Sequence, residues 1–218
     1  MINFKLIKVL AALILSSILL TGCWYPENFE AVINIKATGE YDATYKGHIV
    51  ASDDEASEPI GTGSSNPMMG STFGSTTKLL EAKKKDSQRV YVSTRSRGDI
   101  STEAFKFPNN GDSVFFSIRV LDNGNILAKG TLEKFHEKFE AVSEKTGGTY
   151  SLNGTLKISV DGFVVAHNAD IVSEDGSYHW GFKGNDHSKE PYLIIGCVKR
   201  GGLFCPGSDA SVSGLEVN

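Results

Sequence analysis

The sequence predicts a mainly β, α+β domain: an antiparallel sheet of about eight strands, curved or folded into a sandwich, with one or two covering helices. Apolar and polar residues alternate along most of the chain after residue 28, as in half-buried strands. Turn residues such as Asp-Gly and Asp-Asn-Gly-Asn separate these alternating segments, as in antiparallel hairpins. One segment instead repeats its apolar residues at helical spacing, which predicts a helix packed on the sheet.

The first predicted elements form a hairpin. Residues 29–36 and 41–50 both alternate, and Gly39 lies in the short turn between them. Residues 51–77 then break the pattern, because small, polar and acidic residues dominate there. Such a segment buries too little apolar surface to offset its ordering entropy, so we expect a flexible loop.

A basic segment follows the loop. Residues 78–97 hold seven lysines and arginines against two acids. We expect a short helix over residues 77–86 and a strand over residues 90–94. The segment can serve as a patch for anionic lipid head groups or an acidic partner, or it can be a solvated helix face neutralised by the acidic loop; we favour the second interpretation.

Strands resume at residues 113–121 and 126–130, which an Asp-Asn-Gly-Asn turn joins. A second helix is predicted after them, where apolar residues follow one another at spacings of three, four and three: Leu132, Phe135, Phe139 and Val142. Gly147 and Gly148 end this helix.

The last third of the chain is the clearest β region. Asp-Gly turns separate most of its alternating segments, so we expect strands at the following positions: 154–160, 163–172, 178–182, 192–195 and 211–217. With the hairpin at its start, the region from 29 to 218 is predicted to be one β-rich domain.

The chain begins with the pattern of a signal peptide. Lys5 and Lys8 precede an apolar stretch from residue 9 to residue 20, which small residues close. About a dozen apolar residues are too few for a membrane-spanning helix, which needs about 20. Removal of residues 1–22 leaves 196 residues, enough for a single domain with a substantial core.

The end of this segment, Leu20-Thr21-Gly22-Cys23, resembles the lipobox of bacterial lipoproteins. The resemblance covers only the signal segment, roughly a tenth of the chain. It implies cleavage before Cys23 and a diacylglyceryl group on the Cys23 sulfur, so that acyl chains such as palmitate anchor the protein in a membrane of the cell envelope. If the host has two membranes, Trp24 resembles the pattern sorted to the outer membrane. The alternative is an ordinary secretory signal peptide with a chance cysteine at its end.

Residues 23–28 would then form an acylated tether, which reaches at most about 18 Å. The domain should therefore lie against its membrane.

The other two cysteines, Cys197 and Cys205, form an even pair in a compartment that allows disulfides. A bond between them would close a loop of nine residues. A redox or metal site is the alternative, but the spacing matches neither CxxC chemistry nor common zinc sites.

Histidines in the last third invite a metal or acid-base site, because His167, His179 and His187 lie near Asp170 in the sequence. His167 and Asp170 are an odd number of residues apart, so a regular strand would point them to opposite faces. We therefore interpret these residues as exposed strand and turn positions, and expect no metal ligands and no catalytic residues.

Aromatic residues are numerous and fit either a cavity for a hydrophobic ligand or a plain core. The core is the favoured interpretation, because alternation places aromatics inside any sandwich. The set comprises Phe29, Tyr41, Tyr45, Phe115, Phe116, Phe135, Phe139, Phe163, Tyr178, Trp180 and Phe182.

These patterns favour a lipid-anchored envelope protein that is not an enzyme, needs no cofactor and binds another envelope component, protein or lipid. A net charge of −6 after signal removal argues against nucleic acid as a partner. The first alternative is a carrier or chaperone for a hydrophobic ligand. An enzyme or metal protein that uses His167, His179 and His187 ranks last.

Overall fold

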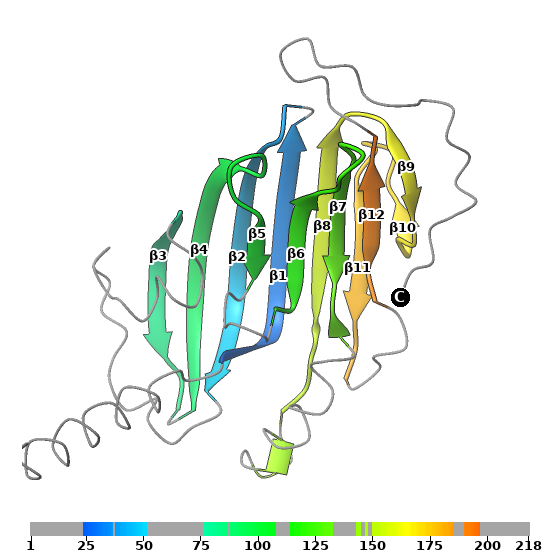
Figure 1. Ribbon diagram of the computed structural model, residues 1–218. Helices are drawn as coiled ribbons and strands as arrows, with labels where there is room; N and C mark the ends of the chain where they lie inside the picture. Colours follow the sequence, from blue (N-terminus) through cyan, green and yellow to red (C-terminus); the bar gives the residue numbers. More distant parts are fainter. Residues whose placement is uncertain are drawn as a thin grey trace, which may run out of the picture.

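The computed structural model describes residues 24–36, 38–51, 76–86, 88–107, 114–132, 143–144, 147, 150–184 and 190–196. They form two sheets that pack face to face (Figure 1). The mainly β, sandwich-like fold is thus confirmed.

One sheet has seven strands, with β1 at its centre between β8 and β2. All neighbours are antiparallel except β1 and β8, which run parallel. In spatial order the strands are β10 (Ile171–Val172), β11 (Tyr178–Phe182), β8 (Gly154–Asp161), β1 (Trp24–Lys36), β2 (Glu40–Ala51), β4 (Arg89–Asp99) and β3 (Thr77–Lys84).

The second sheet has five antiparallel strands. Their order is β5 (Phe105–Phe107), β6 (Phe116–Val120), β7 (Ile126–Gly130), β12 (Tyr192–Ile195) and β9 (Val164–His167). The inner faces of both sheets supply one continuous hydrophobic core, in which Ile118, Ile158 and Leu193 are fully buried.

The predicted first hairpin is confirmed, with Gly39 in the left-handed region at φ 93°. β1 begins at Trp24, however, five residues before the predicted strand. Pro26 is compatible with this strand because β8 pairs with β1 only from Phe29 onward. Among the described strands, the first residues of β1 therefore have a neighbour on one side only, where a missing N–H is tolerated.

A β-bulge interrupts β1 between Glu27 and Glu30, with Asn28 at φ 47°. Asparagine tolerates this conformation better than most residues. The bulge brings Phe29 against two glycines: a Cβ on Gly47 would lie 2.6 Å from Phe29 Cβ, and one on Gly154 would lie 2.5 Å from its ring. These glycines are therefore required for the close approach of Phe29.

The helix predicted over residues 77–86 is wrong: these residues form β3 and the start of a turn. β3 pairs along its length with β4 and forms the edge of the seven-stranded sheet. Lys78, Lys83 and Lys84 are exposed on it, and lysines are common on edge strands because they discourage pairing with other chains.

The strand predicted over residues 163–172 is also wrong as a single element. The chain leaves β8, crosses to the other sheet as β9, and returns to the first sheet as β10. Asp161 and Gly162 thus mark a crossing between sheets rather than a hairpin within one. The turns at residues 122–125 and 174–177 do join antiparallel neighbours, as predicted.

Several predicted features lie outside the described residues. They are the signal peptide 1–22, Cys23, loop residues 52–75, helix residues 133–142, His187, the cysteines Cys197 and Cys205, and residues 211–217. Within the described ranges, no helix is long and apolar enough to cross a membrane.

Candidate functional site

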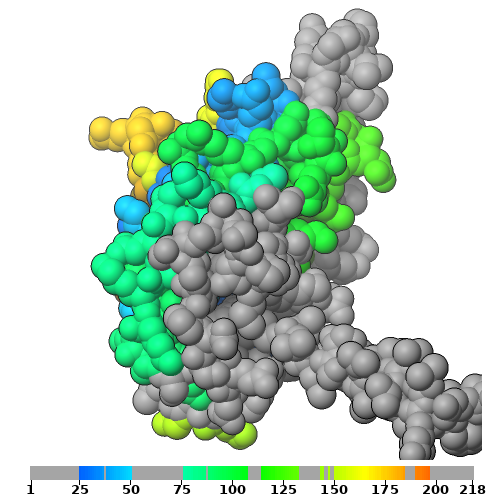
Figure 2. Space-filling model, turned by 90° about the vertical axis from the view of Figure 1, so that its left-hand side faces the viewer, coloured from blue at the N-terminus to red at the C-terminus, as the bar shows by residue number. Residues whose placement is uncertain are grey.

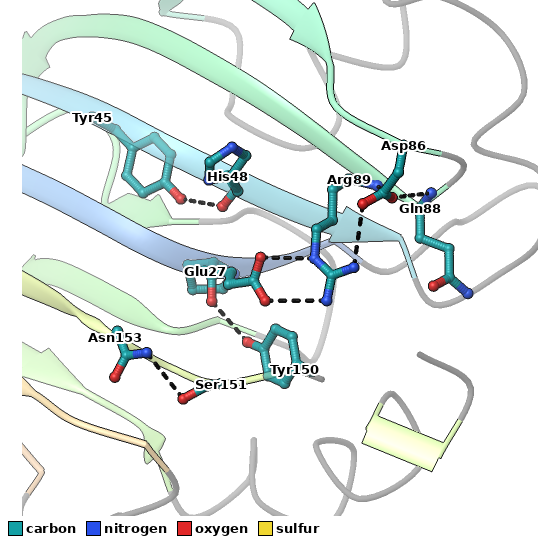
Figure 3. A network of polar contacts seen from close by, with 10 residues as sticks. Glu27, Tyr45, His48, Asp86, Gln88, Arg89, Tyr150, Ser151 and Asn153 are labelled. Atoms are coloured by element: carbon teal, nitrogen blue, oxygen red, sulfur yellow. Dashed lines mark hydrogen bonds and ion pairs between the residues drawn. The ribbon is translucent and has the colours of Figure 1, made fainter. Parts of the chain in front are cut away.

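The start of β1, directly after Cys23, is held by a buried ion pair (Figure 3). Arg89, at the start of β4, donates from Nε to Glu27 Oε2 at 2.9 Å and from Nη2 to Glu27 Oε1 at 3.4 Å. The Glu27 side chain is 4% exposed and that of Arg89 13%. This bidentate contact links residues 62 positions apart in the sequence.

Asp86 extends the pair into the turn between β3 and β4. Arg89 Nη1 lies 3.3 Å from Asp86 Oδ2, and Asp86 Oδ1 accepts hydrogen bonds from the amides of Gln88 and Arg89. Burial raises the pKa of Asp86, but these hydrogen bonds outweigh it, so the pKa lies below its ordinary value. The hydrogen bond to Glu27 raises the pKa of the Arg89 guanidinium. These shifts favour the charged forms of Asp86 and Arg89, and the contacts of Arg89 tie the β3–β4 turn to β1.

Tyr150 holds the same part of β1 from the other side. Its hydroxyl donates to the carbonyl of Pro26 at 2.7 Å, and its ring meets that of Tyr25 edge to face. Burial raises the pKa of Tyr150 well above its ordinary value, so the phenol remains a donor.

His48 lies beside this network on β2. Its ring contacts Tyr91 edge to face, and its Nδ1 is buried with no hydrogen-bond partner in the described part of the chain. Burial lowers the His48 pKa, and the nearby charge of Lys85 lowers it further. Folding therefore favours the neutral ring relative to the unfolded chain.

The residues predicted from the last third do not converge on one site. His167 Nδ1 accepts from the amide of Ala169, and its ring contacts Tyr178. Asp170 Oδ2 accepts from the amide of Gly181. Among the described residues no group of three or more His, Cys, Asp or Glu side chains could hold a metal ion; His187 lies outside them.

The sequence interpretation missed a serine-histidine contact in the turn between β10 and β11. Ser177 Oγ lies 2.7 Å from His179 Nε2, and Ser173 Oγ lies 3.0 Å from the same nitrogen. In a hydrolytic triad the acid binds the other nitrogen of the histidine. Here Asp175 instead accepts from Ser177 Oγ at 2.5 Å and from its amide, which is the geometry of a turn. Ser177 is also fully buried.

Between the sheets, the described strands line a small, partly open cavity of about 20 Å³, whose lining includes Ile33, Tyr45, Phe107 and Phe116. Pockets for small molecules measure about 300 to 1,000 Å³, whereas about 15 Å³ suffices for one water molecule. Most of the predicted aromatics are buried here, but Phe163 is 76% exposed.

The outer face of the seven-stranded sheet carries a charged cluster. Arg95 binds both Asp42 carboxylate oxygens, with its Nε 2.8 Å from Oδ1, and Arg97 Nε lies 3.0 Å from Asp42 Oδ2. These hydrogen bonds hold the pKa of Asp42 below its ordinary value. The cluster makes this part of the sheet face polar and charged.

The fold defines the class of the protein: a two-sheet β-sandwich with mainly antiparallel strands. No protein-family model and no curated protein matches the chain. The NMR structure of the folded domain of Mycobacterium tuberculosis LppM is similar, at 12% identity and a TM-score of 0.41 over 83% of this chain and 96% of that one. An M1 zinc metallopeptidase from Deinococcus radiodurans matches at 9% identity and a TM-score of 0.27, over 79% of this chain and 42% of that one. Neither match assigns a function to this chain.

Proposed function

We propose that the protein is a lipid-anchored component of the bacterial envelope that binds another envelope component and catalyses no reaction. The observation that carries the proposal is the junction between anchor and domain. The lipobox-like sequence ends at Cys23, and β1 begins at the next residue. The domain would thus stand directly on its membrane.

The arrangement of polar groups supports a binding role. Among the described residues, the closest approach to a catalytic set is Ser177, His179 and Asp175, whose hydrogen bonds close a turn. The outer sheet face, in contrast, offers a charged surface around Asp42, Arg95 and Arg97, as suits recognition of a polar partner.

The carrier interpretation receives less support. An acyl chain needs a cavity far larger than the one of about 20 Å³ that the described strands line. Co-purification of lipid in a fixed ratio to the protein would nevertheless favour the carrier.

The test is to crosslink the intact lipoprotein in its own cells, capture it, and identify the attached proteins and lipids by mass spectrometry. The matched control is a Cys23→Ser chain exported by a cleavable secretory signal, which keeps the domain but lacks the anchor. One envelope protein enriched with the anchored chain, and lost when Arg95 and Arg97 become Glu, supports the proposal. Hydrolysis of a cell-wall or ester substrate that a single substitution abolishes would refute it.

A further inference from the structure

We propose that the sheet end formed by the β3–β4 turn is a membrane-contact surface, where Lys84 and Lys85 bind the anionic head groups of the lipid layer that holds the anchor. This inference rests on the acylation of Cys23 proposed above. It adds a second, electrostatic contact and a fixed orientation of the domain on the bilayer.

Strand register places the lysines at the anchor end of the sheet. Trp24 lies opposite Ala51, Val50 opposite Arg89, and Val90 opposite Lys84. Three strand spacings of about 4.8 Å put Lys84 roughly 15 Å from Trp24, to which Cys23 is bonded. In Figure 1 the start of β1 and the end of β3 both lie at the lower end of the sheet. In Figure 2 the blue-green atoms of β3 and β4 lie on the left of the side that faces the viewer.

Among the described residues at this end of the sheet, Lys84 and Lys85 are exposed lysines without a carboxylate partner on β3 or β4. Lys83 pairs with Glu81 on the same strand. Arg89 is bound by Glu27 and Asp86. Lys84 and Lys85 are exposed next to them. Each lysine near an anionic membrane surface contributes a factor of about five to binding, hence roughly thirtyfold for the two, and salt screens the effect.

The buried ion pair fixes the position of the lysines relative to the anchor. Arg89 binds Glu27 in β1 and Asp86 in the turn that follows Lys85 (Figure 3). The amide of Lys85 also donates to the Arg89 carbonyl at 2.9 Å. Because these contacts already hold Lys85 and Asp86, little conformational entropy of their backbone is lost when they meet the membrane.

The same lysines could instead be neutralised by the chain itself. Asp53, Asp54 and Glu55 follow Ala51 in the sequence and lie outside the described residues. These acidic residues are the alternative partners of Lys84 and Lys85, and the experiment must distinguish them from lipid head groups.

The test uses the full lipidated protein in nanodiscs of phosphatidylcholine, alone or mixed with phosphatidylglycerol. An amine-reactive reagent labels the lysines, and peptide mass spectrometry gives the rate at each one. Two exposed lysines of the same sheet are internal controls. Lys78 lies roughly 20 Å along β3 from Lys84, and Lys36 lies roughly 40 Å along β1 from Trp24.

We expect Lys84 and Lys85 to label about fivefold more slowly in the anionic discs than in the zwitterionic ones. High salt should restore their rates, and Lys36 and Lys78 should label equally in both discs. Equal rates for Lys84 and Lys85 in the two discs would overturn the inference. Slow labelling in both discs, relieved by replacing Asp53, Asp54 and Glu55 with their amides, would also overturn it and assign the lysines to the acidic segment.

Failure of the proposed function has a different signature. A protein whose Cys23 carries no acyl chain would not remain with either disc during purification. This outcome overturns the inference together with the anchor, whereas a disc-bound protein with unprotected lysines overturns the inference alone.

Discussion

Replacement of Glu27 by glutamine should destabilise the domain by about 3 kcal/mol. The Glu27 and Arg89 side chains are 4% and 13% exposed, so the variant leaves a nearly buried guanidinium without its main partner. Breaking a buried pair costs about 3 to 5 kcal/mol. The low end applies because Arg89 keeps Asp86 at 3.3 Å.

Urea unfolding of the mature chain with Cys23→Ser, followed by tryptophan fluorescence, measures the loss of unfolding free energy. In a separate thermal unfolding experiment, the midpoint should fall by roughly 6 to 12 °C for a domain of this size. The Glu27→Gln/Arg89→Met double variant should recover much of the loss, because a neutral pair leaves no buried charge.

The matched control is Glu40→Gln, which breaks the Lys36–Glu40 pair, whose side chains are 64% and 56% exposed. Exposed pairs contribute at most about 1 kcal/mol. If Glu27→Gln costs no more than Glu40→Gln, the buried pair does not hold the start of β1 and the reasoning fails.

Three further predictions concern the pH dependence at His48, the close approach at Gly154, and the contrast between a buried residue and an exposed one. Because burial lowers the His48 pKa in the folded state from 6.5, its contribution to stability is complete above that value and is lost as the pH falls toward the lower folded-state pKa. Thermal midpoints between pH 7 and pH 5 should therefore fall less for His48→Gln than for the parent, and parallel curves would contradict this. Gly154→Ala should lower the free energy of unfolding by about 1 to 3 kcal/mol, because its Cβ would lie 2.5 Å from the Phe29 ring. Gly181→Ala should be near neutral, because a Cβ there has nothing within 4 Å. Equal urea midpoints for the two variants would refute the close approach at Gly154. Leu193→Ala, at a fully buried position, should lower the free energy of unfolding by about 2 to 5 kcal/mol. Phe163→Ser, at a position 76% exposed, should change it by no more than about 0.5 kcal/mol. A larger loss for Phe163→Ser than for Leu193→Ala in urea unfolding would show that the core is assigned wrongly.

Local patterns in the sequence predicted the strands but not all of their partners. The hairpins around Gly39 and residues 122–125 follow from alternation and turn chemistry, which act over a few residues. The parallel pairing of β1 with β8 joins segments far apart in the chain, and no local signal specifies it. The crossing of the chain from β8 to β9 escaped prediction for the same reason.

The failed helix at residues 77–86 has a related cause. Glu81 and Lys85 have the spacing of a helical i,i+4 pair, which adds only a few tenths of a kcal/mol. Pairing with β4 outweighs it, since Leu79 and Ala82 pack against the core from β3. Tertiary packing commonly overrides weak local preference.

Of the candidate site, the sequence indicates only the expected acylation position, Cys23. The residues around Cys23 carry their pattern within four positions. The ion pair between Glu27 and Arg89 spans 62 positions, and neither residue belongs to a motif. Burial of a charge is the signal that identifies it, and burial is known only once the sheets are assembled.

Acylation of Cys23, directly before the folded domain, is tested by the mass of the N-terminal peptide of the protein purified from its own envelope membranes. We predict that Cys23 is the first residue and that the peptide carries a diacylglyceryl group. A different first residue, or a free Cys23 thiol, would contradict the account.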